Sequence, residues 1–301
     1  MSWLVLSLLA PLFWAITNFV DKFVLDRYIT SMPDFLFFSS ISSFIFLPLV
    51  VAFLGIPPIE IFGLVPFLLG IIQVSSYSLY AKALVKGETS SLMMLLGASP
   101  VIVIIIGYLF LGQVLDTIEL IASLIVVAGV MIVMVHDIWS FSLKLFFKPG
   151  AGLMLLVVII WSVNFVAADW ALQIMPFREF FVYDMFGMAC AGLLLFLKPS
   201  LRGKVMTGIR SARPAKFGWF LCNTFLDTAA QFCVKLALAL APVAGLVAVA
   251  MQIQNFYLVA IGYALTIFIP HVITEDISPP VILRKMMGAI LMIAGIAMLK
   301  L

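Results

Sequence analysis

Four polar side chains recur at every fourth position within one long apolar stretch, residues 216–240. This polar stripe consists of Asn223, Asp227, Gln231 and Lys235. Residues four apart share one face of an α-helix, and a charged group at the centre of a bilayer costs about 2.5–3.5 kcal/mol. The stripe therefore predicts a helix face that lines a polar cavity, with Asp227 placed to carry a proton. A polar contact that only holds helices together is the alternative.

A second apolar stretch, residues 61–84, carries Gln73, Tyr77 and Tyr80 on one broad helical face. We expect this face to meet the polar stripe across the same cavity. Further cavity candidates are polar or aromatic side chains inside other apolar stretches. They are Trp14, Asn18, Trp161, Asn164, Gln252 and Asn255. For the tryptophans and their neighbouring asparagines, helix packing and an interfacial belt are the alternatives. Gln254 is expected to point away from the face of Gln252.

The remaining intramembrane acids divide by position. Asp184 lies inside the apolar stretch 177–197, so with Asp227 it is a candidate for coupling transport to a proton. Asp21, Lys22 and Asp169 lie at the ends of apolar stretches. There a solvated place at the membrane surface is expected, because charged groups near helix ends reach water.

Motifs of catalysis and metal binding are missing from the sequence. It has no HExxH, no GxSxG and no ATP-binding loop, and its two histidines, His136 and His271, fall in predicted loops. Cys190, Cys222 and Cys233 lack metal-ligand spacing and are expected to be buried free thiols. A net charge of +3 is too small and scattered to indicate a nucleic-acid partner. We therefore expect no enzyme, no cofactor and no metal site.

The elements that position these residues follow from composition. The chain of 301 residues is 65% hydrophobic and 10% charged, whereas soluble domains carry about 25% charged residues. A membrane helix needs about 20 apolar residues. The sequence divides into ten such stretches, which predicts an all-α integral membrane protein with a retained first span. The predicted spans are 2–22, 33–54, 61–84, 89–112, 117–135, 150–172, 177–197, 216–240, 243–268 and 280–300. Pro11, Pro48, Pro66 and Pro100 are expected to kink their spans.

Orientation follows from the basic residues. All 17 Lys and Arg except Arg178, Lys235 and Lys300 fall in or beside loops that follow odd-numbered spans. Because Lys and Arg favour the cytoplasmic side, these loops, including 198–216, are predicted to be cytoplasmic and both termini to lie on the far side. The expected location is the inner or plasma membrane of a cell.

The two halves of the chain repeat each other. Phe62-Gly63 recurs as Phe217-Gly218, and Gly107-Tyr108 recurs as Gly262-Tyr263 at the same offset. Further on, Ala122 and Gly129 have the same spacing as Gly288 and Gly295. Asn18-Phe19-Val20 likewise returns as Asn164-Phe165-Val166. The predicted units are a first five-helix repeat at 1–135, a cytoplasmic linker at 136–149 and a second repeat at 150–301. An odd number of spans inverts the second repeat, an arrangement found in many secondary transporters.

With these features the sequence resembles the drug/metabolite transporter superfamily, and within it the EamA-like ten-span members. The resemblance rests on the segments Trp14-Ala-Ile-Thr-Asn18-Phe, Tyr80-Ala-Lys-Ala-Leu84, Pro100, Gly107-Tyr-Leu-Phe-Leu-Gly112-Gln and Ala128-Gly129-Val130. Two places depart from the family pattern: Gln113 stands where an acid is usual, and Phe268-Ile-Pro-His271 is changed. The resemblance implies ten helices around a central cavity, with the fifth and tenth more peripheral.

The resulting functional expectation is a secondary transporter for a small metabolite or an amphipathic compound, working by alternating access. Its expected partners are the substrate and the lipid bilayer. Proton coupling and substrate exchange both remain open, as does association between copies of the chain. A flippase for a lipid-linked substrate is the main alternative within the same fold, and a channel or an intramembrane enzyme would need motifs that the sequence lacks.

Overall fold

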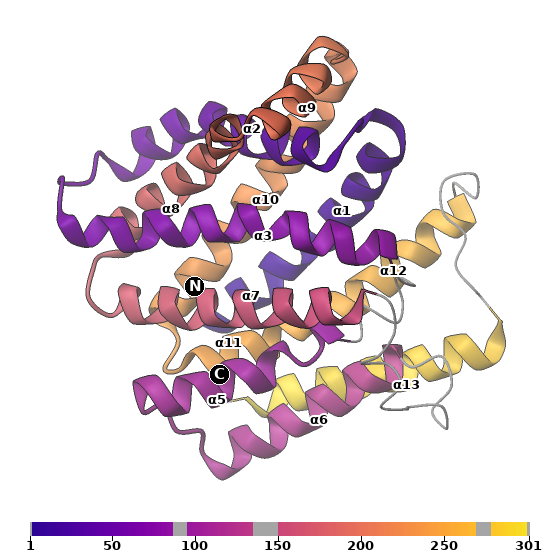
Figure 1. Cartoon of the computed structure of the whole chain (residues 1–301). Coiled ribbons are helices and arrows are strands. Elements are labelled where there is room, and N and C mark those ends of the chain that lie inside the picture. The colour runs from indigo at the N-terminus through magenta and orange to yellow at the C-terminus, as the bar shows by residue number, and fades with distance from the viewer. Residues whose placement is uncertain (1, 87–94, 135–149, 269–277, 300–301) are drawn as a thin grey trace.

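The computed structural model describes residues 2–86, 95–134, 150–268 and 278–299, and within these ranges the regular structure is helical. This confirms the predicted all-α fold class (Figure 1). The elements are α1 (Trp3–Tyr28), α2 (Met32–Leu54), the 3-10 turn η1 (Ile61–Gly63), α3 (Leu64–Lys86), α5 (Ser99–Leu111), α6 (Thr117–Met134), α7 (Ala151–Leu172), α8 (Phe177–Ala191), η4 (Gly192–Leu197), α9 (Pro199–Arg210), α10 (Pro214–Leu240), α11 (Ala244–Ala250), η5 (Met251–Ile253), α12 (Gln254–Phe268) and α13 (Pro279–Met298).

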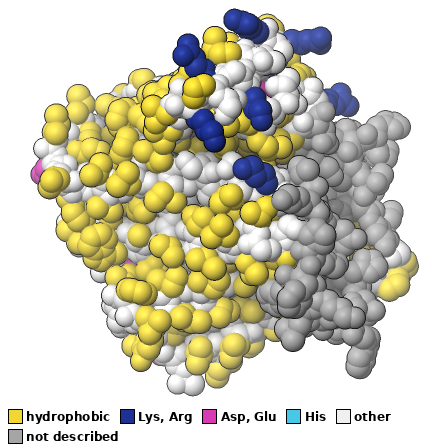
Figure 2. All heavy atoms as spheres, in the orientation of Figure 1, with side chains coloured by type: hydrophobic (Ala, Val, Ile, Leu, Met, Phe, Trp, Pro, Cys, Tyr) yellow, Lys and Arg dark blue, Asp and Glu magenta, His cyan; other side chains and the backbone are white. Residues whose placement is uncertain are grey.

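Seven helical stretches in the described part of the chain are long and apolar enough to cross a membrane. They are Trp3–Leu25, Met32–Leu54, Ile61–Ala83, Ala151–Leu172, Phe177–Leu197, Ala244–Phe268 and Pro279–Met298. Ser99–Leu111 and Thr117–Val133 are shorter apolar helices, and α10 carries the polar stripe. The chain is therefore a multi-pass membrane protein, while the number of ten spans stays a prediction. Figure 2 shows hydrophobic side chains over much of the visible surface.

Several predicted boundaries differ from the structure. The first helix does not end at residue 22 but continues to Tyr28. The predicted span 89–112 is described only from residue 95, and α5 begins at Ser99 with Pro100 in its first turn. Pro66 also lies in the first turn of its helix, α3. Proline is tolerated there because the first amides have no intrahelical partner, so neither residue kinks a span. The predicted linker 136–149 lies outside the described residues.

The predicted cytoplasmic loop 198–216 contains a helix, α9. Its basic side chains and those beside it, namely Lys198, Arg202, Lys204, Arg210 and Arg213, are exposed, and Figure 2 shows Lys and Arg gathered over this end of the molecule. Lys216 is an exception, because it is only 1% exposed. Its Nζ lies 2.7 Å from Asp34 Oδ1, so this basic residue pairs α10 with α2 instead of facing water.

The three cysteines are free, as predicted. They are less buried than expected, because Cys222 is exposed and Cys190 and Cys233 are partly buried.

The helices that carry the candidate residues pack around one another in the centre of the molecule. α1 packs against α10, and α3 packs against both α7 and α8. α2 lies against α8 and α10, and α5 lies against α7 and α11. The main apolar core joins residues of α1, α3, α5, α7, α8, α10 and α11, so the elements that surround the centre come from both halves of the chain.

The helices α6 and α13 run side by side at the periphery (Figure 1) and approach closely through glycine. A Cβ at Gly288 would lie 2.6 Å from the backbone oxygen of Gly129, and one at Gly129 would lie 2.7 Å from the oxygen of Gly288. Farther along the pair, a Cβ at Gly295 would lie 2.8 Å from the Ala122 oxygen. Small residues allow such close contacts between membrane helices.

We expect Gly288→Val to destabilise the protein by about 1–3 kcal/mol, because the added side chain must push α6 away from α13. Thermal unfolding of the purified protein in detergent measures the effect. Gly152→Val is the matched control, since a Cβ at Gly152 in α7 meets nothing within 4 Å. Equal melting temperatures for the two variants would show that α6 and α13 are not held this closely.

Candidate functional site

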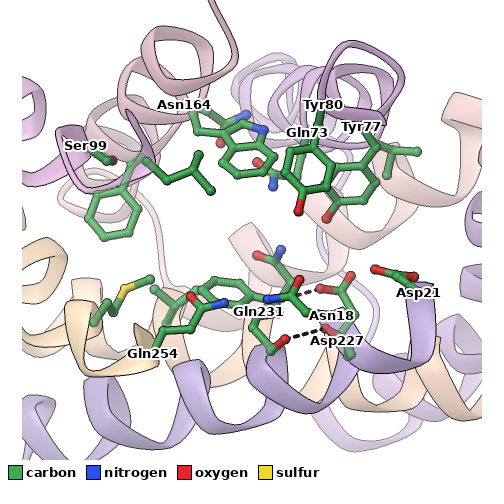
Figure 3. A pocket seen from close by; sticks show the side chains of 18 of the residues that line it. Asn18, Asp21, Gln73, Tyr77, Tyr80, Ser99, Asn164, Asp227, Gln231 and Gln254 are labelled. Carbon is green, nitrogen blue, oxygen red and sulfur yellow. Dashed lines mark hydrogen bonds between the residues drawn. The ribbon is translucent and has the colours of Figure 1, made fainter. Parts of the chain in front are cut away.

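A central cavity of about 280 Å³ lies between two walls of helices. All the residues predicted to line a cavity do so: Trp14, Asn18, Gln73, Tyr77, Tyr80, Trp161, Asn164, Asn223, Asp227, Gln231, Lys235, Gln252 and Asn255. Figure 3 shows the arrangement of the walls. Asn18, Asp21, Asp227 and Gln231 lie on one side, and Gln73, Tyr77, Tyr80 and Asn164 lie on the other.

The first wall is built by α1 and α10, which pack against each other. Trp14 Nε1 donates a hydrogen bond to Asp227 Oδ1 at 2.8 Å, and Asn223 Nδ2 donates to Asp21 Oδ1 at 2.8 Å. Asp21 therefore lines the cavity and does not lie at a solvated helix end as expected. The reason is that α1 continues beyond Asp21 to Tyr28.

The second wall is built by α3 and α7. Trp161 Nε1 donates to Ser76 Oγ at 2.6 Å, and the Trp161 ring lies 5.7 Å from the ring of Tyr80 and 6.3 Å from that of Tyr77, between centroids. Asn164 Nδ2 donates to the backbone oxygen of Leu69 at 2.8 Å. The cavity thus has an aromatic surface on this side, and Asn164 also holds α7 against α3.

Lys235, at the far end of the polar stripe, is held by an acid from another helix. Its Nζ lies 3.9 Å from Asp184 Oδ2 in α8 and 5.4 Å from the ring centre of Phe180. Asp184 is 2% exposed and is not among the residues that line the cavity. Of the two candidates for coupling transport to a proton, Asp227 lines the cavity. Asp184 does not line it but contacts Lys235, which does.

The second half contributes three amide side chains near α11 and α12. Gln252, Gln254 and Asn255 all line the cavity, and Asn255 Nδ2 donates to Gln252 Oε1 at 3.3 Å. The expectation that Gln254 points elsewhere is wrong. It assumed one continuous α-helix, but the 3-10 turn η5 interrupts the helix at Met251–Ile253, and a 3-10 turn changes the angle between successive side chains.

A hydrogen-bonded network joins the helices at one end of the group that surrounds the cavity. Gln113 Nε2 donates to Asp169 Oδ2 at 2.6 Å, and Gln173 Nε2 donates to the same oxygen at 3.0 Å. Gln113 Oε1 also accepts from the backbone N–H of Ala244 at 3.1 Å. Asp169 is only 4% exposed, which corrects the expected solvated position. The network joins the end of α5 to α7 and to the start of α11.

Sequence analysis did not assign Asp21 and Ser39 to the cavity, and only Asp21 has a sequence pattern that could have identified it. Asp21 continues a row in α1 with Trp14, Asn18 and Leu25, all of which line the cavity at helical spacing. Ser39 of α2 also lines the cavity, but a serine in a membrane helix carries no distinctive signal. Among the described residues, no group of three or more His, Cys, Asp or Glu could hold a metal ion.

The comparison with protein families gives a match in the first half of the chain. The model of the EamA-like transporter family matches residues 1–135. Over these residues the chain is similar to that family. The EamA-like segment ends where α6 ends, so the match contains α1, α2, α3, α5 and α6. It confirms, over residues 1–135, the resemblance noted in the sequence.

The fold of the chain is also similar to a known crystal structure over nearly its whole length. The two chains are 14% identical, and the superposition covers 98% of this chain and 95% of the other with a TM-score of 0.64. This similarity of fold includes the residues beyond 135, which the family model does not match. The search of curated proteins gave no match to the sequence.

Proposed function

We propose that the protein is a secondary transporter that moves a small metabolite or an amphipathic compound across the membrane by alternating access. The observation that carries the proposal is a cavity of about 280 Å³ in the centre of a membrane protein, lined by helices of both halves. Transporters bind substrate near the midplane between two repeats. The family of residues 1–135 supports the same class of function.

The helix contacts support two inverted repeats, 1–135 and 150–301. α1 packs on α10, and its predicted counterpart α7 packs on α3. If each helix is replaced by its counterpart in the other repeat, the wall formed by α1 and α10 therefore becomes the wall formed by α7 and α3. The close contact of Gly129 with Gly288 likewise becomes that of Gly295 with Ala122 when each residue is replaced by its counterpart in the repeat. Alternating access requires that two similar halves can exchange their conformations.

Within this proposal, we assign the structure to one state of the transport cycle. Residues that line the cavity include Leu25 and Ala81 near the ends of α1 and α3, which lead to the Lys- and Arg-rich loops. At the other end, Gln113 and Asp169 are hydrogen bonded to each other across the halves. We infer that the cavity communicates with the cytoplasmic side in this state and that the Gln113–Asp169 contact must break for it to reach the other side.

A topology experiment tests this orientation. We expect Ser200→Cys, at the exposed start of α9, to be protected in intact cells from a membrane-impermeant thiol reagent and to react after the cells are opened. The background is a variant in which Cys190, Cys222 and Cys233 are replaced by serine. Ile59→Cys, which lies in the predicted opposite loop, should react in intact cells. The reverse pattern would invert the assigned orientation.

Counterflow in proteoliposomes tests the transport function. Liposomes loaded with an unlabelled compound are diluted into the labelled compound, using a panel of amino acids, nucleosides, sugars and organic cations. A carrier accumulates label transiently through exchange for at least one compound. Lipid scrambling without counterflow would support a flippase, and permeation that does not depend on exchange would support a channel. Either result would contradict the proposal.

A further inference from the structure

Two carboxylates lie close together at one end of the cavity, on the wall formed by α1 and α10. Asn223 is hydrogen bonded to Asp21, and Asp227 follows Asn223 by one helical turn and is hydrogen bonded to Trp14. Among the described side chains, no Lys or Arg forms an ion pair with Asp21 or Asp227. Both carboxylates line the cavity, so a bound molecule can reach them.

The hydrogen-bond partners of these carboxylates do not balance their charge. Trp14 and Asn223 are neutral donors, and each supplies one bond to a carboxylate oxygen. The carbonyl oxygen of Asn223, Oδ1, is buried and has no hydrogen-bond partner. A buried acceptor without a donor is costly, and so is a charge without a counter-ion. This end of the cavity therefore offers more acceptors than the protein satisfies.

Lys235 does not supply the missing positive charge. It is two turns from Asp227 on the same helix, or roughly 12 Å along the axis. Its Nζ is instead paired with Asp184 at 3.9 Å and lies near the ring of Phe180. The Lys235–Asp184 pair is neutral as a unit. Among the described residues that line the cavity, the remaining charged side chains are therefore Asp21 and Asp227.

The opposite wall has the chemistry that commonly accompanies a bound cation. Figure 3 shows Tyr77 and Tyr80 across the cavity from Asp227 and Asp21. Their rings are grouped with that of Trp161. Aromatic faces attract cations through their quadrupole, and the attraction grows when water is excluded. Val74 and Val234 add apolar surface to the lining.

We propose that the cavity selects an organic cation, namely an alkyl- or arylammonium compound. Its charged group lies between Asp21 and Asp227, and its apolar part lies against the tyrosine and tryptophan rings. The proposal rests on the proposed transport function, because it assigns the substrate class of the same cavity. Net negative charge in the lining disfavours anions. Among the described residues that line the cavity, the pairing of Lys235 leaves no free cation for the carboxylate of a zwitterion.

Binding to the purified protein in nanodiscs tests the charge requirement. The probes are phenethylammonium, the neutral 3-phenylpropanol, the anion 3-phenylpropanoate and the zwitterion phenylalanine, which share one aromatic group. Calorimetry measures affinity, and partial quenching of the tryptophan fluorescence, to which Trp14 and Trp161 of the cavity contribute, reports occupation of the cavity. We expect phenethylammonium to bind at least about 10-fold more tightly than each of the others.

Asp21→Asn and Asp227→Asn should each weaken phenethylammonium binding about 10-fold or more and leave 3-phenylpropanol binding nearly unchanged. Glu60→Gln is the control, because Glu60 is an exposed acid outside the cavity. The comparison of the four probes on the unaltered protein does not depend on the folding of any variant. Equal or tighter binding of the anion or zwitterion, or no binding of the cation, would overturn the inference.

The same experiments separate this inference from the transport function. Counterflow of an anionic or neutral compound without cation binding would reject the cation site and retain the transporter. Selective cation binding through Asp21 and Asp227 without counterflow of any compound would retain the site and reject the transporter.

Discussion

Lys216→Met is expected to destabilise the protein by about 3–5 kcal/mol, because it leaves the buried carboxylate of Asp34 without its counter-ion. Lys216 Nζ contacts both oxygens of Asp34, at 2.7 and 2.8 Å, and Asp34 is fully buried. Thr30 supplies two more hydrogen bonds to Asp34 through its backbone N–H and its hydroxyl, each 3.0 Å long. The pair fixes the start of α10 to the start of α2.

A double-mutant cycle distinguishes the unpaired charge from other effects of the substitution. Combining Lys216→Met with Asp34→Asn removes both charges and should regain much of the lost stability, since no uncompensated charge remains. Lys204→Met, on the exposed side of α9, is the control for removal of a basic residue and should change the melting temperature little. A Lys216→Met protein that melts like the unaltered one would show that the pair is not buried as described.

Asp227→Asn is expected to reduce transport at least about 10-fold, the size of an effect that removes one charged contact to a substrate. Asparagine keeps the shape of the side chain and an oxygen that can accept the bond from Trp14 Nε1. Membrane insertion and melting temperature should therefore be preserved. If Asp227 carries the coupling proton, any pH dependence of transport should disappear in the same variant.

Initial rates of counterflow for the unaltered protein, Asp227→Asn and Glu60→Gln measure this effect. The Glu60 variant should transport normally. Asp184→Asn provides a second comparison, because Asp184 does not line the cavity and is paired with Lys235. Unchanged transport by Asp227→Asn would contradict the assignment of Asp227 to the substrate path and leave only a role in holding α1 against α10.

The sequence was sufficient to predict which helix faces line the cavity. In the polar stripe, and in Gln73, Tyr77 and Tyr80, helical spacing alone decides which side chains share a face, and the structure places all of them around one cavity. The all-α membrane class followed from composition for a similar reason, because an apolar surface requires lipid as its solvent.

What could not be predicted depends on contacts between distant segments or on irregular backbone. The Lys216–Asp34 and Lys235–Asp184 pairs each join helices that are far apart in sequence, and helical spacing within one element does not reveal such partners. Gln254 was misplaced because η5 interrupts a helix that appears continuous in the sequence. Asp169 was misplaced because its partner Gln113 meets it only after α5 and α7 pack together.

Accessibility of one cavity residue from each side of the membrane tests alternating access most directly. The measurement uses Asn18→Cys in the cysteine-free background, labelled by an impermeant thiol reagent in right-side-out and in inside-out vesicles. Asn18 lines the cavity, so alternating access predicts labelling from both sides. It also predicts that Gln113→Ala, which removes the bond to Asp169, accelerates labelling from the side opposite the Lys- and Arg-rich loops. Labelling from one side only, with or without Gln113→Ala, would contradict a cavity that alternates between the two faces of the membrane.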